Sequence, residues 1–167
     1  MKPKIHESSY IDETAVIIGN VKIGKNCGVF PYAVIRGDQN YIEIGEGSNV
    51  QDCCIIHVNS EHKTILGKNV SLGHASMVHG ATIEDNCIIG INSVILNGAR
   101  IGAGSIVGAG AVVTSEMIVP ENSLVLGIPG KVVKQDTKFR EQAIKNAETY
   151  QRLSKEHKLG KHHRYSP

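Results

Sequence analysis

The feature that most constrains this chain is an aliphatic residue repeated every six positions. From Ile83 to Val125 the stride is unbroken and places eight residues, namely Ile83, Ile89, Ile95, Ile101, Val107, Val113, Val119 and Val125. A helix has a period of 3.6 and a flat strand a period of 2, so neither keeps a six-residue spacing over so long a run. A coil of short flat faces and tight corners does, and such self-similarity is typical of solenoids.

The same stride covers most of the chain, with three interruptions. It runs from Ile5 to Ile35, resumes three residues late at Ile44, and resumes four residues late at Leu66. One residue is then lost before Ile83. If three faces make one turn, a turn takes about 18 residues and the chain makes nearly seven turns. We therefore predict an all-β solenoid over residues 1–135, whose handedness the stride alone leaves open.

The residues after the solenoid follow a different period. Over 136–160 the apolar residues recur at intervals of three and four, at Phe139, Ala143, Ala147, Tyr150 and Leu153. This spacing predicts an amphipathic C-terminal α-helix that packs on the solenoid. We expect residues 161–167, which are rich in Lys, His and Arg, to form a flexible basic tail.

The amino-acid composition limits the classes of partner and the cellular compartment that we expect for this chain. Hydrophobic residues make up 41% of the chain but aromatic residues only 4%, which suits a narrow aliphatic core. The net charge of +2 argues against nucleic acid as a partner, and no apolar run approaches the roughly 20 residues that span a membrane. The four cysteines form no CxxC pair, so we expect free, mostly buried thiols in a reducing cytoplasm.

Two histidines fall in register on neighbouring turns. His57 follows the inward residue Ile56, and His79 follows the inward residue Val78. The four extra residues between them leave the two histidines one turn apart, about 4.8 Å from each other in an outward column that begins at Arg36. A lone histidine on a strand is usually a surface residue, but two in register favour a metal site.

A second column stacks Asp52 beneath His74 by the same count. Both columns adjoin the interruptions of the stride, and insertions into a solenoid gather on its functional side. Three histidines with an open position are typical of a catalytic zinc site. His74 lies on the preceding face, so one chain is not expected to close the site. We predict a homotrimer in which a symmetric partner donates His74 to the pair formed by His57 and His79.

At these residues the chain resembles the γ-class carbonic anhydrases. The resemblance extends from about Ile11 to Leu153 and rests on four blocks in order, namely Arg36-Gly37-Asp38, Asn49-Val50-Gln51-Asp52, His57, and Gly73-His74 through His79-Gly80. These are hexapeptide-repeat proteins, some of them labelled ferripyochelin-binding. The resemblance implies that the solenoid is a left-handed parallel β-helix and that His57, His74 and His79 are the metal ligands.

The resemblance also implies roles for residues around the metal. Gln51 would hydrogen-bond the metal-bound solvent, Asn49 would position bicarbonate, and Tyr150 would lie near the metal. Arg36 and Asp38 would form a salt bridge that helps to assemble the trimer. Asp52 would pair with an arginine at the interface.

The implied reaction is the reversible hydration of CO2 to bicarbonate by a metal-bound hydroxide, with Zn as the metal and Fe2+ or Co2+ as alternatives. The best-studied branch of the family has two glutamates tied to proton shuttling, where this chain has Gln39 and Ser60. We therefore expect weak activity or another proton route. His62, in the inserted loop, is the candidate shuttle because its intrinsic pKa suits the task.

Two other functions stay open at this point. The first is a metal- or siderophore-binding protein without turnover, which would use the same ligands. The second is an acyl-CoA transferase or thioesterase, because acyltransferases share the hexapeptide repeat. Acyltransferases do not need three histidines at ligand spacing, which favours the carbonic anhydrase interpretation.

Overall fold

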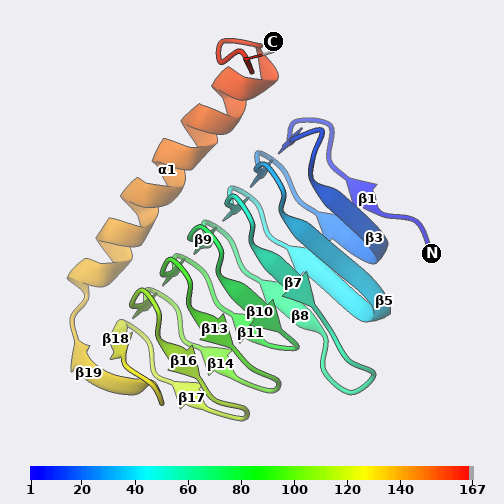
Figure 1. Cartoon of the computed structure of the whole chain (residues 1–167). Helices are drawn as coiled ribbons and strands as arrows, with labels where there is room; N and C mark the ends of the chain where they lie inside the picture. The colour runs from blue at the N-terminus through cyan, green and yellow to red at the C-terminus, as the bar shows by residue number, and fades with distance from the viewer. Residues whose placement is uncertain (166–167) are drawn as a thin grey trace.

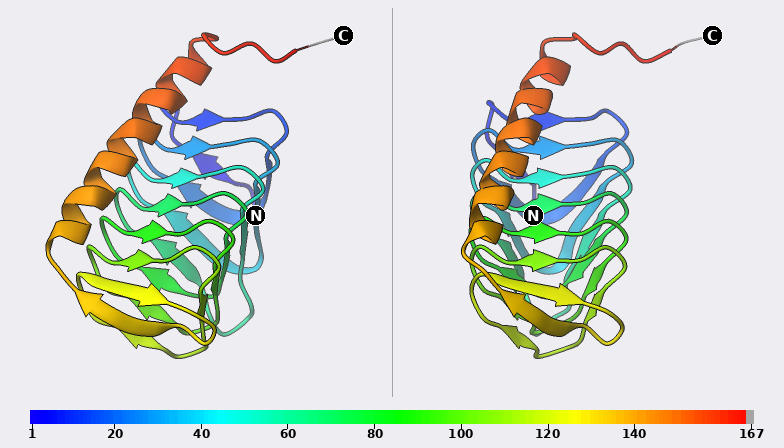
Figure 2. Two further views of the ribbon diagram at one scale, coloured as in Figure 1. Left: turned by 60° about the vertical axis from the view of Figure 1, so that its left-hand side comes forward. Right: turned by 90° about the vertical axis from the view of Figure 1, so that its left-hand side faces the viewer.

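The chain coils into about 7 turns of β-helix. The computed structural model describes residues 1–165. Within these residues one helix, α1 (Lys138–Lys158), runs back along the outside of the column, from its last turns toward its first (Figures 1 and 2). The fold is the left-handed parallel β-helix with a C-terminal helix that the resemblance implies.

The strands of the described chain form two sheets in which each strand pairs with its counterpart one turn away. The first has 11 strands, with the path β16 (Val112–Val113), β13 (Val94–Ile95), β10 (Met77–His79), β7 (Ile55–His57), β5 (Val34–Ile44), β8 (Thr64–Leu66), β11 (Thr82–Ile83), β14 (Arg100–Ile101) and β17 (Ile118–Val119), joined by β3 (Val16–Ile23) and β1 (Lys4–Ile5). The second has 8 strands, in the order β19 (Lys131–Gln135), β18 (Ser123–Leu126), β15 (Ile106–Val107), β12 (Ile88–Ile89), β9 (Ser71–Leu72), β6 (Asn49–Val50), β4 (Gly28–Val29) and β2 (Tyr10–Ile11).

The two sheets make three faces, because β3 and β5 each turn a corner. The start of β5 pairs with β7, and its end pairs with β8. We call the face that contains β7, β10, β13 and β16 face one, and the face that contains β8, β11, β14 and β17 face two. The second sheet is face three. A turn therefore crosses three faces, as the 18-residue count requires.

The strand pairing reproduces the interruptions of the stride. On face one the partners are 18, 21, 22, 17 and 18 residues apart, in the pairs Val16–Val34, Val34–Ile55, Ile55–Met77, Met77–Val94 and Val94–Val112. The inserted residues therefore bulge outward at the corners of the β-helix. The strands of the next turn still pair in register with those of the turn before. The loop between β7 and β8 projects from the column for this reason (Figure 1).

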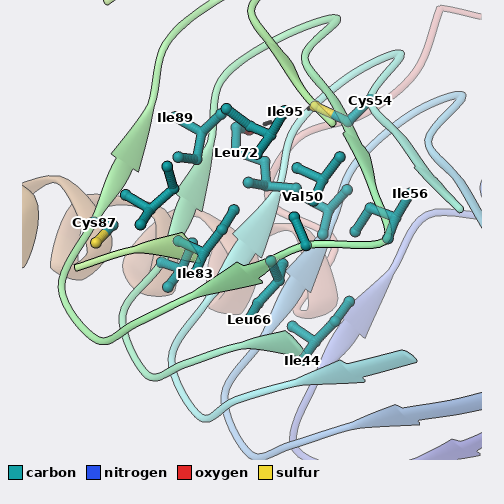
Figure 3. Close-up of a cluster of buried hydrophobic side chains, with 14 of the residues drawn as sticks. Ile44, Val50, Cys54, Ile56, Leu66, Leu72, Ile83, Cys87, Ile89 and Ile95 are labelled. Atoms are coloured by element: carbon teal, nitrogen blue, oxygen red, sulfur yellow. Dashed lines mark hydrogen bonds between the residues drawn. The ribbon is translucent and has the colours of Figure 1, made fainter. Parts of the chain in front are cut away.

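The inward residues of the stride fill the core. Ile56, Leu72, Ile83 and Ile95 come from all three faces, are fully buried, and lie in one cluster in the interior (Figure 3). Burying such a side chain contributes about 1.5–3 kcal/mol each. The core is continuous through the interrupted turns as well as the regular ones, since residues of both groups are equally buried.

The corners of the regular turns are made by residues in the left-handed region, again one every six positions. These residues are Asn86, Asn92, Gly98, Gly104, Gly110, Glu116 and Asn122. Asn and Gly are the residues that adopt this conformation most readily. Glu116, with φ 61°, departs from that pattern.

Helix α1 lies against face three, where it contacts β2, β4, β6 and β9. Its buried residues are Ala143, Ala147 and Ser154, and the Asp136 carboxylate accepts a hydrogen bond from the Lys138 N–H at its start. The helix begins and ends two residues inside the expected range. Over residues 1–165, no helix combines the length and the apolar character needed to cross a membrane.

The segment after α1 was expected to be a flexible tail. In the structure Arg164 forms ion pairs with Asp12 and Glu13 of the first turns, and His162 forms one with Glu156. Residues 166–167, the end of the expected tail, lie outside the described residues. The tail's mobility therefore stays a prediction, while Arg164 has partners on the solenoid.

Candidate metal centre

His57 and His79 lie side by side on face one. They are directly paired in the register of β7 and β10, and their ring centroids are 4.9 Å apart. Arg36 occupies the same column one turn earlier, because Ile35 pairs with Ile56. The Nδ1 atom of His57 lies 3.0 Å from the Nε2 atom of His79. Two imidazole nitrogens therefore converge on one point of the surface.

The outer nitrogen of each ring faces an oxygen that can only accept. The Nε2 atom of His57 lies 3.0 Å from Oδ1 of Asp38, and the Nδ1 atom of His79 lies 2.6 Å from Oδ1 of Asn97. The Arg36 guanidinium, followed by His57, holds the pKa of Asp38 below its usual range, so Asp38 is a carboxylate. Each ring can therefore donate its outer N–H to that oxygen and present its other nitrogen toward the neighbouring ring.

A divalent cation between the two facing nitrogens would use both of them as ligands. Two nitrogens bound to one tetrahedral zinc at about 2.0–2.1 Å lie roughly 3.3 Å apart. The 3.0 Å between the facing nitrogens is close to that separation. Asp38 and Asn97 are the kind of outer partner that orients metal-binding histidines. The residues present therefore fit a divalent metal.

The ring of His74 also has an oxygen acceptor at one nitrogen, but it lies at a different place on the surface. It lies on the corner after β9, and its Nδ1 atom is 2.8 Å from Oδ2 of Asp52. This contact leaves Nε2 free to bind at the surface, where the Tyr150 hydroxyl is 3.5 Å away. Within residues 1–165 of one chain, no three His, Cys, Asp or Glu side chains converge to hold a metal. His74 is thus built as a ligand but is separate from the His57 and His79 pair.

Tyr150 reaches the site from α1. Its ring packs edge-on against Phe30, with centroids 5.5 Å apart. Burial, with the nearby Asp52, raises the pKa of Tyr150. The hydroxyl therefore stays protonated at neutral pH and can donate a hydrogen bond beside Nε2 of His74.

Gln51 and Asn49 lie deeper than their predicted roles would suggest. Asn49 is 1% exposed and Gln51 is 4% exposed. The Asn49 amide donates to Ser71 Oγ at 2.8 Å and accepts from the Gln51 amide at 3.1 Å. Within one chain both polar groups of Asn49 are therefore engaged by protein. The roles of Gln51 and Asn49 toward solvent and bicarbonate stay predictions.

The remaining predicted residues have partners in the chain. Arg36 Nη1 lies 2.5 Å from Asp38 Oδ2, which is the expected ion pair. Asp52 pairs with His74 here, whereas the arginine expected for it is not among its partners in the described chain. His62 Nε2 lies 3.2 Å from Oε1 of Glu116.

The cysteines near the site are free thiols that do not join it. Cys54 is buried, and burial raises its pKa above the ordinary value. Its Sγ lies 3.1 Å from the Gly73 carbonyl oxygen. A buried thiol with a raised pKa stays protonated and is a poor ligand. Cys53 is exposed, and among the described residues its thiol has no hydrogen-bond partner.

Sequence reasoning missed Asn97 and Glu116, because the stride places neither of them in the histidine column. Val78 pairs with Ile95, so the turn that follows His79 is 17 residues long and Leu96 continues the column of Arg36, His57 and His79. Asn97 lies one position past that column, at the corner, and its Oδ1 atom reaches Nδ1 of His79 from there. Glu116 lies one turn above Gly98, and its N–H donates to the Asn97 carbonyl oxygen at 2.9 Å.

The outward side of face one is apolar beside the histidine column. Six turns contribute one apolar residue each to a stripe, Val16, Val34, Ile55, Met77, Val94 and Val112. Val16 and Ile55 are 44% and 40% exposed. Face two carries charged residues such as Lys22, Glu43 and Arg100 at its outward positions, and α1 covers face three. Face one is therefore the apolar face that one chain leaves uncovered.

Comparison with known proteins places the chain. Residues 80–115 match the family model described as bacterial transferase hexapeptide (six repeats). A probable carbonic anhydrase from Methanocaldococcus jannaschii is 48% identical over 90% of this chain and 95% of its own length. The chain belongs to the γ-carbonic anhydrase family of hexapeptide-repeat proteins. Gamma carbonic anhydrase 1 of Arabidopsis thaliana mitochondria is 31% identical over 93% of this chain and 59% of that protein.

Solved structures agree with this membership. A hexapeptide transferase family protein from Anaplasma phagocytophilum is 35% identical and superimposes with a TM-score of 0.87, covering 91% of this chain and 90% of the other. Family membership makes a metal expected at the histidines, and the facing nitrogens of His57 and His79 fit one. The positions of the expected shuttle glutamates hold Gln39 and Ser60 in this member of the family.

Proposed function

We propose that this chain forms a homotrimer that hydrates CO2 reversibly to bicarbonate at metal sites shared between neighbouring copies. The observation that carries the proposal is the pair of facing ring nitrogens of His57 and His79, 3.0 Å apart, each in a ring whose outer nitrogen faces an oxygen acceptor. The oxygen acceptors at the outer nitrogens, Asp38 and Asn97, allow both facing nitrogens to serve as ligands. A carbonic anhydrase needs such a pair as two of three nitrogen ligands.

Each residue of the site has a defined task in this proposal. His57 and His79 of one copy and His74 of its neighbour would hold the metal. A bound zinc-like ion lowers the pKa of water toward 7 and so supplies the nucleophile for CO2. Asp38, Asn97 and Asp52 fix the tautomers of the three ligands by accepting their outer protons.

The surfaces beside the ligands support the shared site. The apolar stripe of face one adjoins His57 and His79, and covering it favours association. The corner that carries His74 also exposes Tyr32 and Ile91, at 64% and 53%. Face one of one copy and this corner of another are different patches, so the contact is heterologous and closes into a ring of three.

Other groups would act on the substrate side. The protonated Tyr150 hydroxyl lies beside Nε2 of His74, where it can donate to a bound oxygen. Gln51 would hydrogen-bond the solvent at the metal and Asn49 would help to position bicarbonate, once assembly brings a neighbour against them. We place the protein in the cytoplasm, since its four cysteines are free thiols.

The first test measures metal and activity together. Protein purified without oxygen is analysed for zinc, iron and cobalt, and CO2 hydration is followed by stopped flow on each metal form. We expect one divalent metal per chain and hydration above the buffer rate. No hydration by any metal form would leave a metal-binding protein without turnover.

The second test separates a shared site from one within a chain. His57→Ala and His74→Ala should each abolish metal binding as pure trimers. Unfolding and reassembling the two variants together creates mixed trimers, each with one intact site. Random assembly should restore about a quarter of the sites. No recovery of metal binding in well-folded mixed trimers would contradict the shared site.

Acyl transfer is the second candidate, because the matching family model and the Anaplasma structure carry transferase names. An acyltransferase would not need His57 and His79 to face each other. Turnover of acetyl-CoA that survives His57→Ala would favour this function over CO2 hydration.

A further inference from the structure

The inserted loop between β7 and β8 brings a histidine beside the proposed metal site. Asn59 organises the loop, because its Oδ1 atom accepts the N–H groups of Glu61 and His62 at 3.0 and 2.7 Å. The same oxygen lies 3.2 Å from Nδ1 of the His62 ring. Asn40 ties this loop to the other insertion by donating to the Asn59 and Ser60 carbonyl oxygens. The ring of His62 therefore has a fixed position.

Glu116 meets the other side of that ring from two turns away. Its Oε1 atom lies 3.2 Å from Nε2 of His62. Glu116 occupies a left-handed corner, with φ 61°, where the other regular corners use Asn or Gly. A non-glycine residue in that conformation costs about 1–2 kcal/mol. The backbone conformation of this corner does not favour a glutamate. The contact of the Glu116 carboxylate with His62 does favour one.

Two glycines clear the space between the site and Glu116. A Cβ on Gly98 would lie 2.0 Å from Oε1 of Glu116, so the carboxylate crosses the place of a missing side chain. A Cβ on Gly80 would lie 2.8 Å from Cβ of His62 and 2.6 Å from Oδ1 of Asn97. Gly80 is the residue after His79. His62 and Glu116 therefore form a continuous line of contacts that starts at Gly80, next to the proposed ligand His79.

We propose that His62 and Glu116 form the proton exit of this site, with Glu116 as the residue that positions His62 and accepts its proton. The inference rests on the proposed CO2 hydration, which converts CO2 and water into bicarbonate and one proton. That proton enters the His62 imidazole from solvent at the site, and the Nε2 proton passes to the Glu116 carboxylate. Glu116 is 71% exposed and returns the proton to a buffer base. In the reverse reaction each transfer runs backward.

The surroundings of His62 favour this direction. The other ionisable groups near the loop are Glu61 and Lys63 within it and His57 and His79 on β7 and β10. Within residues 1–165, Glu116 is the acid that forms an ion pair with His62. The oxygens at Nδ1 and Nε2 are both acceptors, so each ring nitrogen can donate its N–H to a partner already in place. The ring thus takes up a proton with both N–H groups already partnered.

The test replaces Glu116 by Gln in the full-length trimer loaded with zinc. In weak buffer we expect kcat to fall by about tenfold to a hundredfold, with a much smaller change in kcat/KM for CO2. Added imidazole should restore kcat, because it removes the proton without the relay. Glu121→Gln is the matched control, since Glu121 is 63% exposed and paired with Arg140 away from the site. It should behave as the wild type does.

A second readout does not depend on turnover. Long-range 1H–15N spectra of the zinc-loaded protein show which ring nitrogens of His62 carry protons. We expect a protonated Nε2 in the wild type and a shift toward the Nδ1–H form in Glu116→Gln. Unchanged spectra together with unchanged kcat in weak buffer would overturn the relay. If the wild type shows no hydration even with imidazole, the proposed function fails instead, whatever the spectra show.

Discussion

The regular turns from Ile83 to Val125 and the interrupted turns from Ile35 to His79 have the same core but different corners. Ile56 and Ile101, one from each region, are both fully buried in the same kind of stack. The interrupted turns add residues at two corners and carry all three predicted ligands. A parallel β-helix can therefore change its chemistry at the corners while its interior stays constant. The reason is that each turn contacts only its neighbours, so an insertion is extruded locally.

The comparison also shows that the regular turns do more than support the site. Asn97 and Glu116 both belong to the regular run, yet one contacts His79 and the other contacts His62. The interrupted turns supply the three predicted ligands and His62, and the regular turns supply Asn97 and Glu116 as partners of His79 and His62. The oxygens that face His57 and His74 belong to the interrupted turns, so only part of the site depends on the regular ones.

The largest expected effect tests whether the core is one continuous structure. Ile101→Ala and Ile56→Ala each remove a fully buried side chain and should each lower the free energy of unfolding by about 2–5 kcal/mol. Urea unfolding followed by circular dichroism, at one protein concentration, measures both. Ile118→Ala, at 66% exposure, is the control and should have little effect. A much smaller loss for Ile56→Ala would mean that the interrupted turns are packed differently.

A smaller effect is expected where a regular turn supports the site. Asn97→Ala removes the oxygen that accepts the Nδ1 proton of His79, so the ring loses its fixed tautomer. Metal affinity should fall by about 10- to 100-fold, as measured by competition with a chelator. Asn97→Asp keeps an acceptor at the same place and should retain most of the affinity. If Asn97→Ala bound metal as tightly as the wild type, Asn97 would not orient His79, and the regular turns would contribute only to the fold.

Much of this architecture was predictable from the stride. Counting in sixes identifies the buried residues and stacks His57 beside His79 and Asp52 beside His74, and the pairing of β7 with β10 confirms the first stack. The count succeeds because strand pairing and inward packing both repeat with the turn. It does not place Asn97 in the histidine column, because the pairing of Val78 with Ile95 aligns His79 with Leu96.

The contacts at the corners could not be counted in this way. Asp38 was predicted to pair with Arg36, and its second contact with His57 depends on the path of an inserted loop. Glu116 reaches His62 across two turns because Gly98 leaves room, which a position in a repeat does not reveal. The depth of Asn49 depends on α1, which lies about 90 residues later in the sequence. The shared site depends on a second copy of the chain, and so stays a prediction.

The smallest expected effect compares two ion pairs of similar exposure on different faces. Arg36 pairs with Asp38 beside the histidines of face one, and Arg100 pairs with Glu84 on face two. Exposed ion pairs contribute little to the stability of a single chain, so neither Arg36→Ala nor Arg100→Ala should change the fold. Only Arg36→Ala removes a charge from the proposed contact between copies. The concentration at which half of the trimer dissociates should therefore rise a few-fold for Arg36→Ala and stay constant for Arg100→Ala in sedimentation experiments. Equal shifts for both variants would mean that face one is not the assembly surface, because a charge on face two would then matter as much as one beside the ligands.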